Sequence, residues 1–126
     1  MDGRASVLII DDDPSHLRIY GWIITQAGYE ALPALVRSDG IDYPEARVDV
    51  VVLDYRLTGK LTAVEVAEAT RARYPNAPII LLSDVYDLPA DIAPHVQAFV
   101  RKGEPAKLVA TLAEFAKLAI EPDGAA

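Results

Sequence analysis

One stretch decides the fold of this chain: Val50-Val51-Val52-Leu53-Asp54-Tyr55-Arg56-Leu57-Thr58-Gly59. Its first four residues are apolar and three of them are β-branched, which is typical of a strand buried on both faces of a parallel sheet. Asp54 ends this run with a side chain that is costly to bury. We therefore expect Asp54 at the carboxyl edge of the sheet, facing a crevice. On this stretch alone, an aspartate that only begins a turn stays an open alternative.

Length and charge narrow the class of protein. The chain has 126 residues, which suits a single domain over 1–126, with a core over about 6–119 and a tail over 120–126. Lys and Arg number 12 against 19 Asp and Glu, a formal net charge of −7, so we expect no direct binding of nucleic acid. The absence of cysteine excludes disulfides, thiol catalysis and thiolate zinc sites.

The sequence also bears on localisation. Residues 1–6 lack the basic start and the long apolar core of a signal peptide. No apolar run approaches the length that spans a membrane. We therefore expect a cytoplasmic protein without a membrane partner.

Short apolar runs alternate with helical patterns along the chain. We expect strands over residues 6–10, 29–35, 50–54, 79–82 and 97–101, and regular helices over 14–27, over 62–74 and from 105 onward. Asp13 before Pro14 is a strong helix start, because aspartate caps free N–H groups and proline fits the first helical position. Thr62 and Glu65 match a capping box.

Two segments interrupt this pattern. Gly40 and Pro44 leave room only for a short or irregular helix over 38–47. Pro89 and Pro94 limit the element between them to about one or two helical turns. The repeated units of strand and helix predict a doubly wound α/β fold, with a five-stranded parallel sheet and a shortened fourth helix.

The first helix carries two apolar stripes. One runs through Leu17 and Ile24, and the other through Ile19, Trp22 and Ile23. We interpret the two stripes as one wide buried face. An exposed docking patch for a partner helix is the alternative.

Polar residues follow four of the expected strands. Asp11 and Asp12 follow the first strand, Asp54 the third, Ser83 the fourth and Lys102 the fifth. The carboxyl ends of parallel strands meet at one edge of a sheet, so these side chains are expected to converge on a single site.

These residue types restrict the cation and the reaction that such a site can support. Converging carboxylates form an oxygen-only environment that favours Mg²⁺ over zinc. An aspartate can act as a nucleophile and form an acyl phosphate. Lys102 would neutralise charge on the transferred group, and the Ser83 hydroxyl would donate to a phosphoryl oxygen. The residue types therefore fit phosphoryl transfer to an aspartate.

Four motifs follow one another along the chain: Ile9-Ile10-Asp11-Asp12-Asp13-Pro14, Leu53-Asp54-Tyr55-Arg56-Leu57, Leu82-Ser83 and Phe99-Val100-Arg101-Lys102. Together they resemble a response-regulator receiver domain of two-component signalling, of the single-domain type, over nearly the full chain. The resemblance implies a flavodoxin-like fold with strand order 2-1-3-4-5. It also implies a histidine kinase or phosphotransfer protein as the phosphoryl donor and an unidentified protein as the downstream partner.

The resemblance implies a phosphorylation site and a metal site. Asp54 corresponds to the phosphoacceptor of the family. Asp11 and Asp12 resemble the acidic pair that holds Mg²⁺ directly or through water. Asp54 and the backbone carbonyl of Arg56 are the further ligands that the resemblance implies.

Three other residues take roles from the same resemblance. Ser83 resembles the switch hydroxyl, and Phe99 resembles the aromatic residue that reorients with it. Lys102 resembles the lysine that pairs with the aspartate or the phosphoryl oxygen. Without the resemblance, Phe99 is most simply a core side chain.

The chain also departs from the family. Thr58 stands where proline is frequent, so the loop after Asp54 could differ in shape. Gly103 replaces the proline after the lysine, so no cis peptide is expected there. Asp84 follows Ser83 where a small residue is usual, and its carboxylate would repel a phosphoryl group or tune its loss.

These departures leave alternatives to a Mg²⁺-dependent phosphoacceptor. A non-phosphorylated pseudo-receiver that serves as a protein–protein interaction module is one. A small phosphatase is weaker, because no second acid follows two residues after Asp54. We expect at most self-phosphorylation and self-dephosphorylation, without turnover of an external substrate. His16 and His95 have no acidic or histidine partner at ligand spacing, and we expect both to be structural or solvent-facing.

Overall fold

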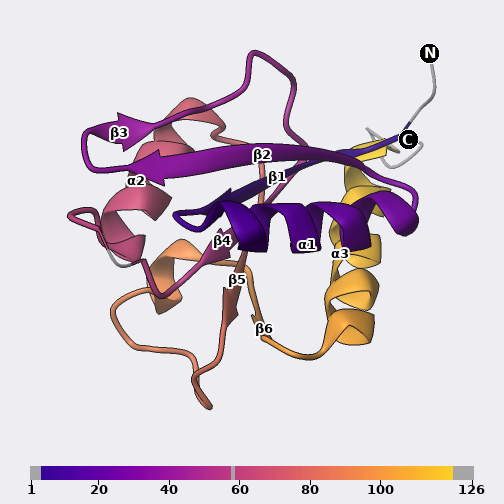
Figure 1. The fold of residues 1–126 in the computed structure, drawn as a ribbon. Helices are drawn as coiled ribbons and strands as arrows, with labels where there is room; N and C mark the ends of the chain where they lie inside the picture. Colours follow the sequence, from indigo (N-terminus) through magenta and orange to yellow (C-terminus); the bar gives the residue numbers. More distant parts are fainter. Residues whose placement is uncertain (1–3, 58, 121–126) are drawn as a thin grey trace.

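The sheet forms at the apolar runs of the sequence, in a computed structural model that describes residues 4–57 and 59–120. The strands are β1 (Ser6–Asp11), β2 (Glu30–Arg37), β3 (Gly40–Ile41), β4 (Val50–Asp54), β5 (Ile79–Ser83) and β6 (Ala98–Arg101). Their order is β3-β2-β1-β4-β5-β6 (Figure 1). Among the described residues only β3 pairs antiparallel, and the five parallel strands there stand in the predicted order 2-1-3-4-5. The two-residue strand β3 was not predicted.

Two helices pack on one face of the sheet and one helix packs on the other (Figure 1). The helices are α1 (Pro14–Gln26), α2 (Ala63–Arg73) and α3 (Pro105–Ile120). Alternate strand residues supply two cores: in β1, Val7 and Ile9 pack with α1 and α3, whereas Leu8 and Ile10 pack on the α2 side. β1, β4 and β5 are thus buried along their whole length, as their apolar runs predict, whereas β2 and β6 are buried only in part. Within the described ranges, no helix has the length and apolarity needed to cross a membrane.

The second strand is not followed by a helix, which corrects the expected series of strand and helix units. After β2 the described chain turns into β3 and continues without a helix over 42–49. Tyr43 covers the sheet instead: its hydroxyl lies 2.9 Å from Thr70 Oγ1, and its ring packs edge-on against Tyr74. Side-chain burial against α2 therefore replaces the helix that Gly40 and Pro44 disfavour.

The fourth helix is shortened, as predicted. A single 3₁₀ turn, η1 (Ala93–His95), forms between β5 and β6. Pro89 and Pro94 oppose a longer helix, because proline lacks the N–H that a helix interior needs. Ile92, just before η1, is fully buried in the core on the α2 side.

Both predicted helix starts are confirmed. Asp13 caps α1 by accepting a hydrogen bond from the Ser15 N–H at 2.8 Å. Thr62 Oγ1 accepts from the Glu65 N–H at 3.1 Å, and Glu65 Oε1 accepts from the Thr62 N–H at 2.9 Å. The side chains at these starts satisfy N–H groups that the helices leave free.

The wide buried face expected for α1 is wrong in part. Leu17 and Ile24 are buried, but Ile19 and Trp22 are 56% and 66% exposed. At 3.6 residues per turn, the exposed pair lies about 180° around the helix from the buried pair. One side of α1 therefore meets the sheet while the other meets solvent, and the docking-patch alternative stays open.

Candidate functional site

Three strand ends meet at the carboxyl edge of the sheet. β1, β4 and β5 are neighbours, and they end at Asp11, Asp54 and Ser83. These side chains are buried, with exposures of 2%, 3% and 0%. β6 pairs with β5 and places Lys102 just past its own end. The structure therefore brings together the polar strand ends that the sequence singled out.

Lys102 reaches back from its loop to Asp54. Its Nζ lies 2.8 Å from Asp54 Oδ1, and the lysine side chain is 20% exposed. The Lys102 N–H donates to the Ser83 carbonyl oxygen at 2.7 Å, which fixes the start of the loop. Gly103 follows with φ +87°, a left-handed conformation that proline cannot adopt. The backbone here thus suits the glycine that replaces the usual proline.

Burial shifts the pKa values of the charged side chains at the site. It raises the pKa of Asp54, and the Lys102 ammonium offsets part of that rise. Burial and the charge of Asp54 raise the pKa of Asp11 to about 6. Burial opposes the charged form of Lys102, yet the carboxylates of Asp54 and Asp11 outweigh it and raise the pKa of the lysine. Two buried carboxylates share one ammonium, so the site attracts a further cation.

His16 is a site residue that the sequence analysis missed. Its Nδ1 lies 3.2 Å from Asp11 Oδ2, and its Nε2 lies 3.6 Å from Asp13 Oδ2, so the expectation that it has no acidic partner is wrong. The cause is the helix start: His16 is the third helical residue after the cap, and side chains at this position reach back toward the helix N-terminus. The Asp13-Pro14 signal could have indicated this placement. His95 lies half-buried in η1.

The carboxylates fit a divalent cation. Asp11, His16 and Asp54 offer ligand atoms that all lie within 4.8 Å of one another. Buried carboxylate oxygens that one lysine balances only in part are suitable ligands for Mg²⁺. Asp12 is half-buried and hydrogen-bonds with Asp11. The roles of Asp12 and of the Arg56 carbonyl as metal ligands stay predictions.

A second ion pair lies at the same edge. Arg56 Nε pairs with Asp84 Oδ1, and both side chains are more than half exposed. The hydrogen bond from Arg56 lowers the pKa of Asp84, so this carboxylate is ionised at neutral pH and balanced by the guanidinium. Arg56 therefore weakens the repulsion that we expected Asp84 to exert on a phosphoryl group. Thr58 lies outside the described residues, and its effect on the loop stays a prediction.

The two expected switch residues lie at neighbouring strands. Ser83 Oγ accepts a hydrogen bond from the Val85 N–H at 3.2 Å, which leaves the hydroxyl hydrogen available for another acceptor. Phe99, on β6, is half-buried and packs against the core on the α2 side. Their switch roles stay predictions.

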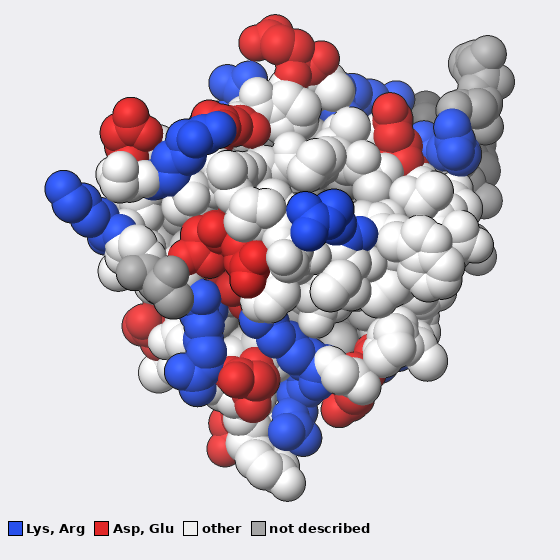
Figure 2. All heavy atoms as spheres, in the orientation of Figure 1, with Lys and Arg blue, Asp and Glu red and all other residues white. Residues whose placement is uncertain are grey.

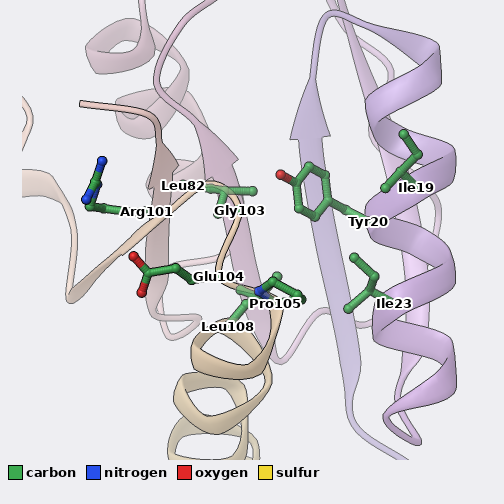
Figure 3. Close-up of a pocket in the computed structure, with 9 residues that line it drawn as sticks. All are labelled: Ile19, Tyr20, Ile23, Leu82, Arg101, Gly103, Glu104, Pro105 and Leu108. Carbon is green, nitrogen blue, oxygen red and sulfur yellow. The ribbon is translucent and has the colours of Figure 1, made fainter. Parts of the chain in front are cut away.

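The surroundings of the site are charged on one side and apolar on another. Figure 2 shows acidic side chains gathered beside the start of α1, with basic side chains next to them. A pocket of about 210 Å³ lies between α1 and α3 (Figure 3). It is lined by Ile19, Tyr20, Ile23, Leu82, Arg101, Gly103, Glu104, Pro105 and Leu108. Tyr20 links the two regions, because it also interacts with the charges of Lys102, Asp54 and Asp11.

Comparison with known proteins identifies the family. The family model of the response regulator receiver domain matches residues 7–113. Two transcriptional regulatory proteins, GlrR of Escherichia coli K12 and QseF of Escherichia coli O157:H7, are each 27% identical over 90 residues. This match covers 71% of the chain and 20% of each relative, so the chain spans about a fifth of their length.

Solved structures show the same fold. The chemotaxis protein CheY4 of Vibrio cholerae is similar with a TM-score of 0.73 and 24% identity, over 89% of this chain and 98% of that protein. A CheY-like receiver domain protein of Methanospirillum hungatei is similar with a TM-score of 0.76 and 18% identity, over 92% of this chain and 96% of that protein. At these identities the likeness shows the flavodoxin-like fold.

Proposed function

Because the chain belongs to the response regulator receiver domain family, we propose that it accepts a phosphoryl group on Asp54 from a histidine kinase or phosphotransfer protein. The reaction depends on Mg²⁺, and the phosphorylated chain signals through a partner protein. The observation that carries this proposal is the setting of Asp54: its carboxylate is buried at the end of β4, 2.8 Å from the Lys102 ammonium and close to Asp11.

Each residue at the edge has a part in the transfer. A carboxylate oxygen of Asp54 attacks phosphorus, the phosphorus–nitrogen bond of the donor phosphohistidine breaks, and an acyl phosphate forms. Lys102 stays at the site and balances the charge of the phosphoryl oxygens. The Ser83 hydroxyl donates a hydrogen bond to one of these oxygens. Asp11, Asp54, Asp12 and the Arg56 carbonyl would hold Mg²⁺, which when bound would supply further positive charge near the phosphoryl group.

Phosphorylation of Asp54 changes the structure of the neighbouring strand ends and of the segment that follows β5. Ser83 ends β5, and Phe99 lies on β6 and packs against the core cluster that contains Ile92, the residue before η1. A phosphoryl group that draws the Ser83 hydroxyl toward itself also pulls on the Val85 N–H, which now donates to that hydroxyl at 3.2 Å. The segment from Val85 to η1 is therefore the surface whose shape we expect a downstream partner to read.

The test is phosphorylation by a small acyl phosphate donor, followed by intact-mass measurement. With Mg²⁺ the wild-type chain gains one phosphate, because Asp54 is the nucleophile and the donor needs no kinase. Asp54→Asn gains none, and chelation of Mg²⁺ removes the gain from the wild type. Asp84→Asn is the matched control and still gains one phosphate. Asp84 also follows a strand end, but it is exposed and paired with Arg56.

Absence of an adduct with any donor would contradict the proposal. It would favour the pseudo-receiver alternative, in which the fold binds a partner without phosphorylation. In that case Asp54→Asn would leave partner binding unchanged. Under the proposal, Asp54→Asn removes the phosphorylation-dependent part of that binding.

A further inference from the structure

We propose that His16 supplies a nitrogen ligand to the metal site, so that Asp11, His16 and Asp54 together bind divalent transition ions such as Co²⁺ and Zn²⁺. The inference deepens the proposed function and rests on its metal site. It names a second class of cation and a ligand that Mg²⁺ binding does not require.

The distances suit shared ligation. Two ligand atoms about 2.1 Å from one ion lie about 3.0 Å apart at a right angle and about 3.4 Å apart at a tetrahedral angle. His16 Nδ1 and Asp11 Oδ2 are 3.2 Å apart. Asp54 adds a carboxylate oxygen within 4.8 Å of both. One ion can therefore contact all three groups with small adjustments of their side chains.

Asp13 lies beside the imidazole and favours one tautomer. Its Oδ1 caps α1, and its Oδ2 lies 3.6 Å from His16 Nε2. A carboxylate beside Nε2 favours a hydrogen on that nitrogen, which leaves the Nδ1 lone pair directed at Asp11 and the ion. Histidines that bind metals commonly have such a carboxylate behind the ring.

His16 is also accessible to an ion from solvent. Its side chain is 40% exposed, whereas that of Asp11 beside it is 3% exposed. Imidazole nitrogen is a good ligand for cobalt and zinc, whereas Mg²⁺ prefers oxygen. His16 should therefore affect the two classes of ion differently.

A hydrogen bond to Asp11 is the simpler role for this histidine, and His16→Gln separates the two roles. Glutamine at the third helical position suits a helix start and keeps a side-chain donor. It lacks the imidazole lone pair that binds a metal ion.

The experiment is calorimetric titration of the tag-free full chain with Co²⁺ and with Mg²⁺, at a pH of about 7.5 where an ordinary imidazole is neutral. We expect His16→Gln to lose roughly tenfold or more in Co²⁺ affinity and less than about threefold in Mg²⁺ affinity. His95→Gln, the matched control on η1, keeps both affinities. In the wild type, Zn²⁺ shifts the His16 Nδ1 signal in long-range ¹H–¹⁵N spectra, and circular dichroism checks that each variant is folded.

Two results would overturn the inference. One is equal Co²⁺ affinity in the wild type and His16→Gln. The other is an equal loss of Co²⁺ and Mg²⁺ affinity in the variant, which would mean that the ring only shapes the pocket.

Its failure is distinguishable from failure of the proposed function. Phosphorylation is tested on the wild-type chain, by its gain of one phosphate with Mg²⁺ and a small donor, and the metal inference is tested by the Co²⁺ affinities of the wild type and His16→Gln. If the wild type gains no phosphate while Co²⁺ binding depends on His16, the metal inference stands and the phosphoacceptor proposal fails.

Discussion

The two ion pairs at the carboxyl edge of the sheet differ in burial. The Lys102–Asp54 side chains are 20% and 3% exposed, and the Arg56–Asp84 side chains are 59% and 57% exposed. Burial raises the pKa of Asp54, whereas the hydrogen bond from Arg56 lowers the pKa of Asp84. The Asp54 carboxylate therefore lacks part of the positive charge that would balance it, whereas the Asp84 carboxylate is balanced by Arg56.

This difference favours Asp54 over Asp84 as the proposed phosphoacceptor. Solvent screens the Arg56–Asp84 pair, so it has little influence on its surroundings. The buried pair carries a desolvation cost that its mutual attraction repays only in part. A further cation, and then a charged phosphoryl group beside Lys102, can therefore bind where the fold already holds unbalanced charge.

Breaking the buried pair is expected to have the largest effect on stability. Lys102→Met leaves the Asp54 and Asp11 carboxylates buried without a cation. Without Mg²⁺ at neutral pH, we expect a loss of about 3 kcal/mol in the free energy of unfolding, at the lower end for buried pairs because Lys102 is partly exposed. Urea denaturation followed by circular dichroism measures this loss. Arg56→Met should leave the midpoint unchanged, and an equal shift in both variants would contradict the comparison.

The stability of the metal-free chain should depend on pH in an unusual direction. The folded-state pKa of Asp11 is about 6, above the ordinary 3.8, so the folded state binds more protons than the unfolded state between these values. The stability from this proton is present below pH 3.8 and is lost as the pH rises through about 6. Acidification from about pH 7 to pH 5 should therefore stabilise the folded chain by about 1 kcal/mol.

Urea denaturation at a series of pH values, in the presence of a chelator, measures this pH dependence. Asp11→Asn should remove most of the gain, because it removes the group whose pKa is raised. Asp84→Asn should leave the gain intact, since the pKa of Asp84 is lowered and its titration lies below this range. A wild-type chain whose stability changes with acidification in the same way as that of Asp11→Asn would contradict the raised pKa.

The exposed pair should act on the rate of phosphorylation without affecting stability. Arg56→Ala leaves the charge of Asp84 unbalanced, so we expect phosphorylation by an anionic donor to slow by about twofold to threefold. Asp84→Asn leaves Arg56 unpaired and should speed it by a similar factor. At roughly 1 M salt both changes should vanish, because the Debye length falls to about 3 Å. Timed intact-mass measurement follows the rate, and a change that persists in high salt would argue against this screened role.

Much of the fold and of the site could be predicted because its signals are local. The apolar run before Asp54 defines a strand end, and the pair Asp13-Pro14 defines a helix start. Strand β3 and the chain over 42–49 escaped prediction, since their arrangement depends on contacts of Tyr43 with residues of and next to α2. Such contacts join residues that are far apart in the sequence and leave no periodic pattern.

By itself, the sequence determined that the acids, the serine and the lysine follow parallel strands and so share one edge of a sheet. Only the tertiary structure decided which charge faces which. Lys102 pairs with Asp54, Arg56 pairs with Asp84, and His16 turns toward Asp11. Residue types and spacing indicate which groups approach the edge. The energy of each charge depends on ångström distances and on burial, which only the packed chain establishes.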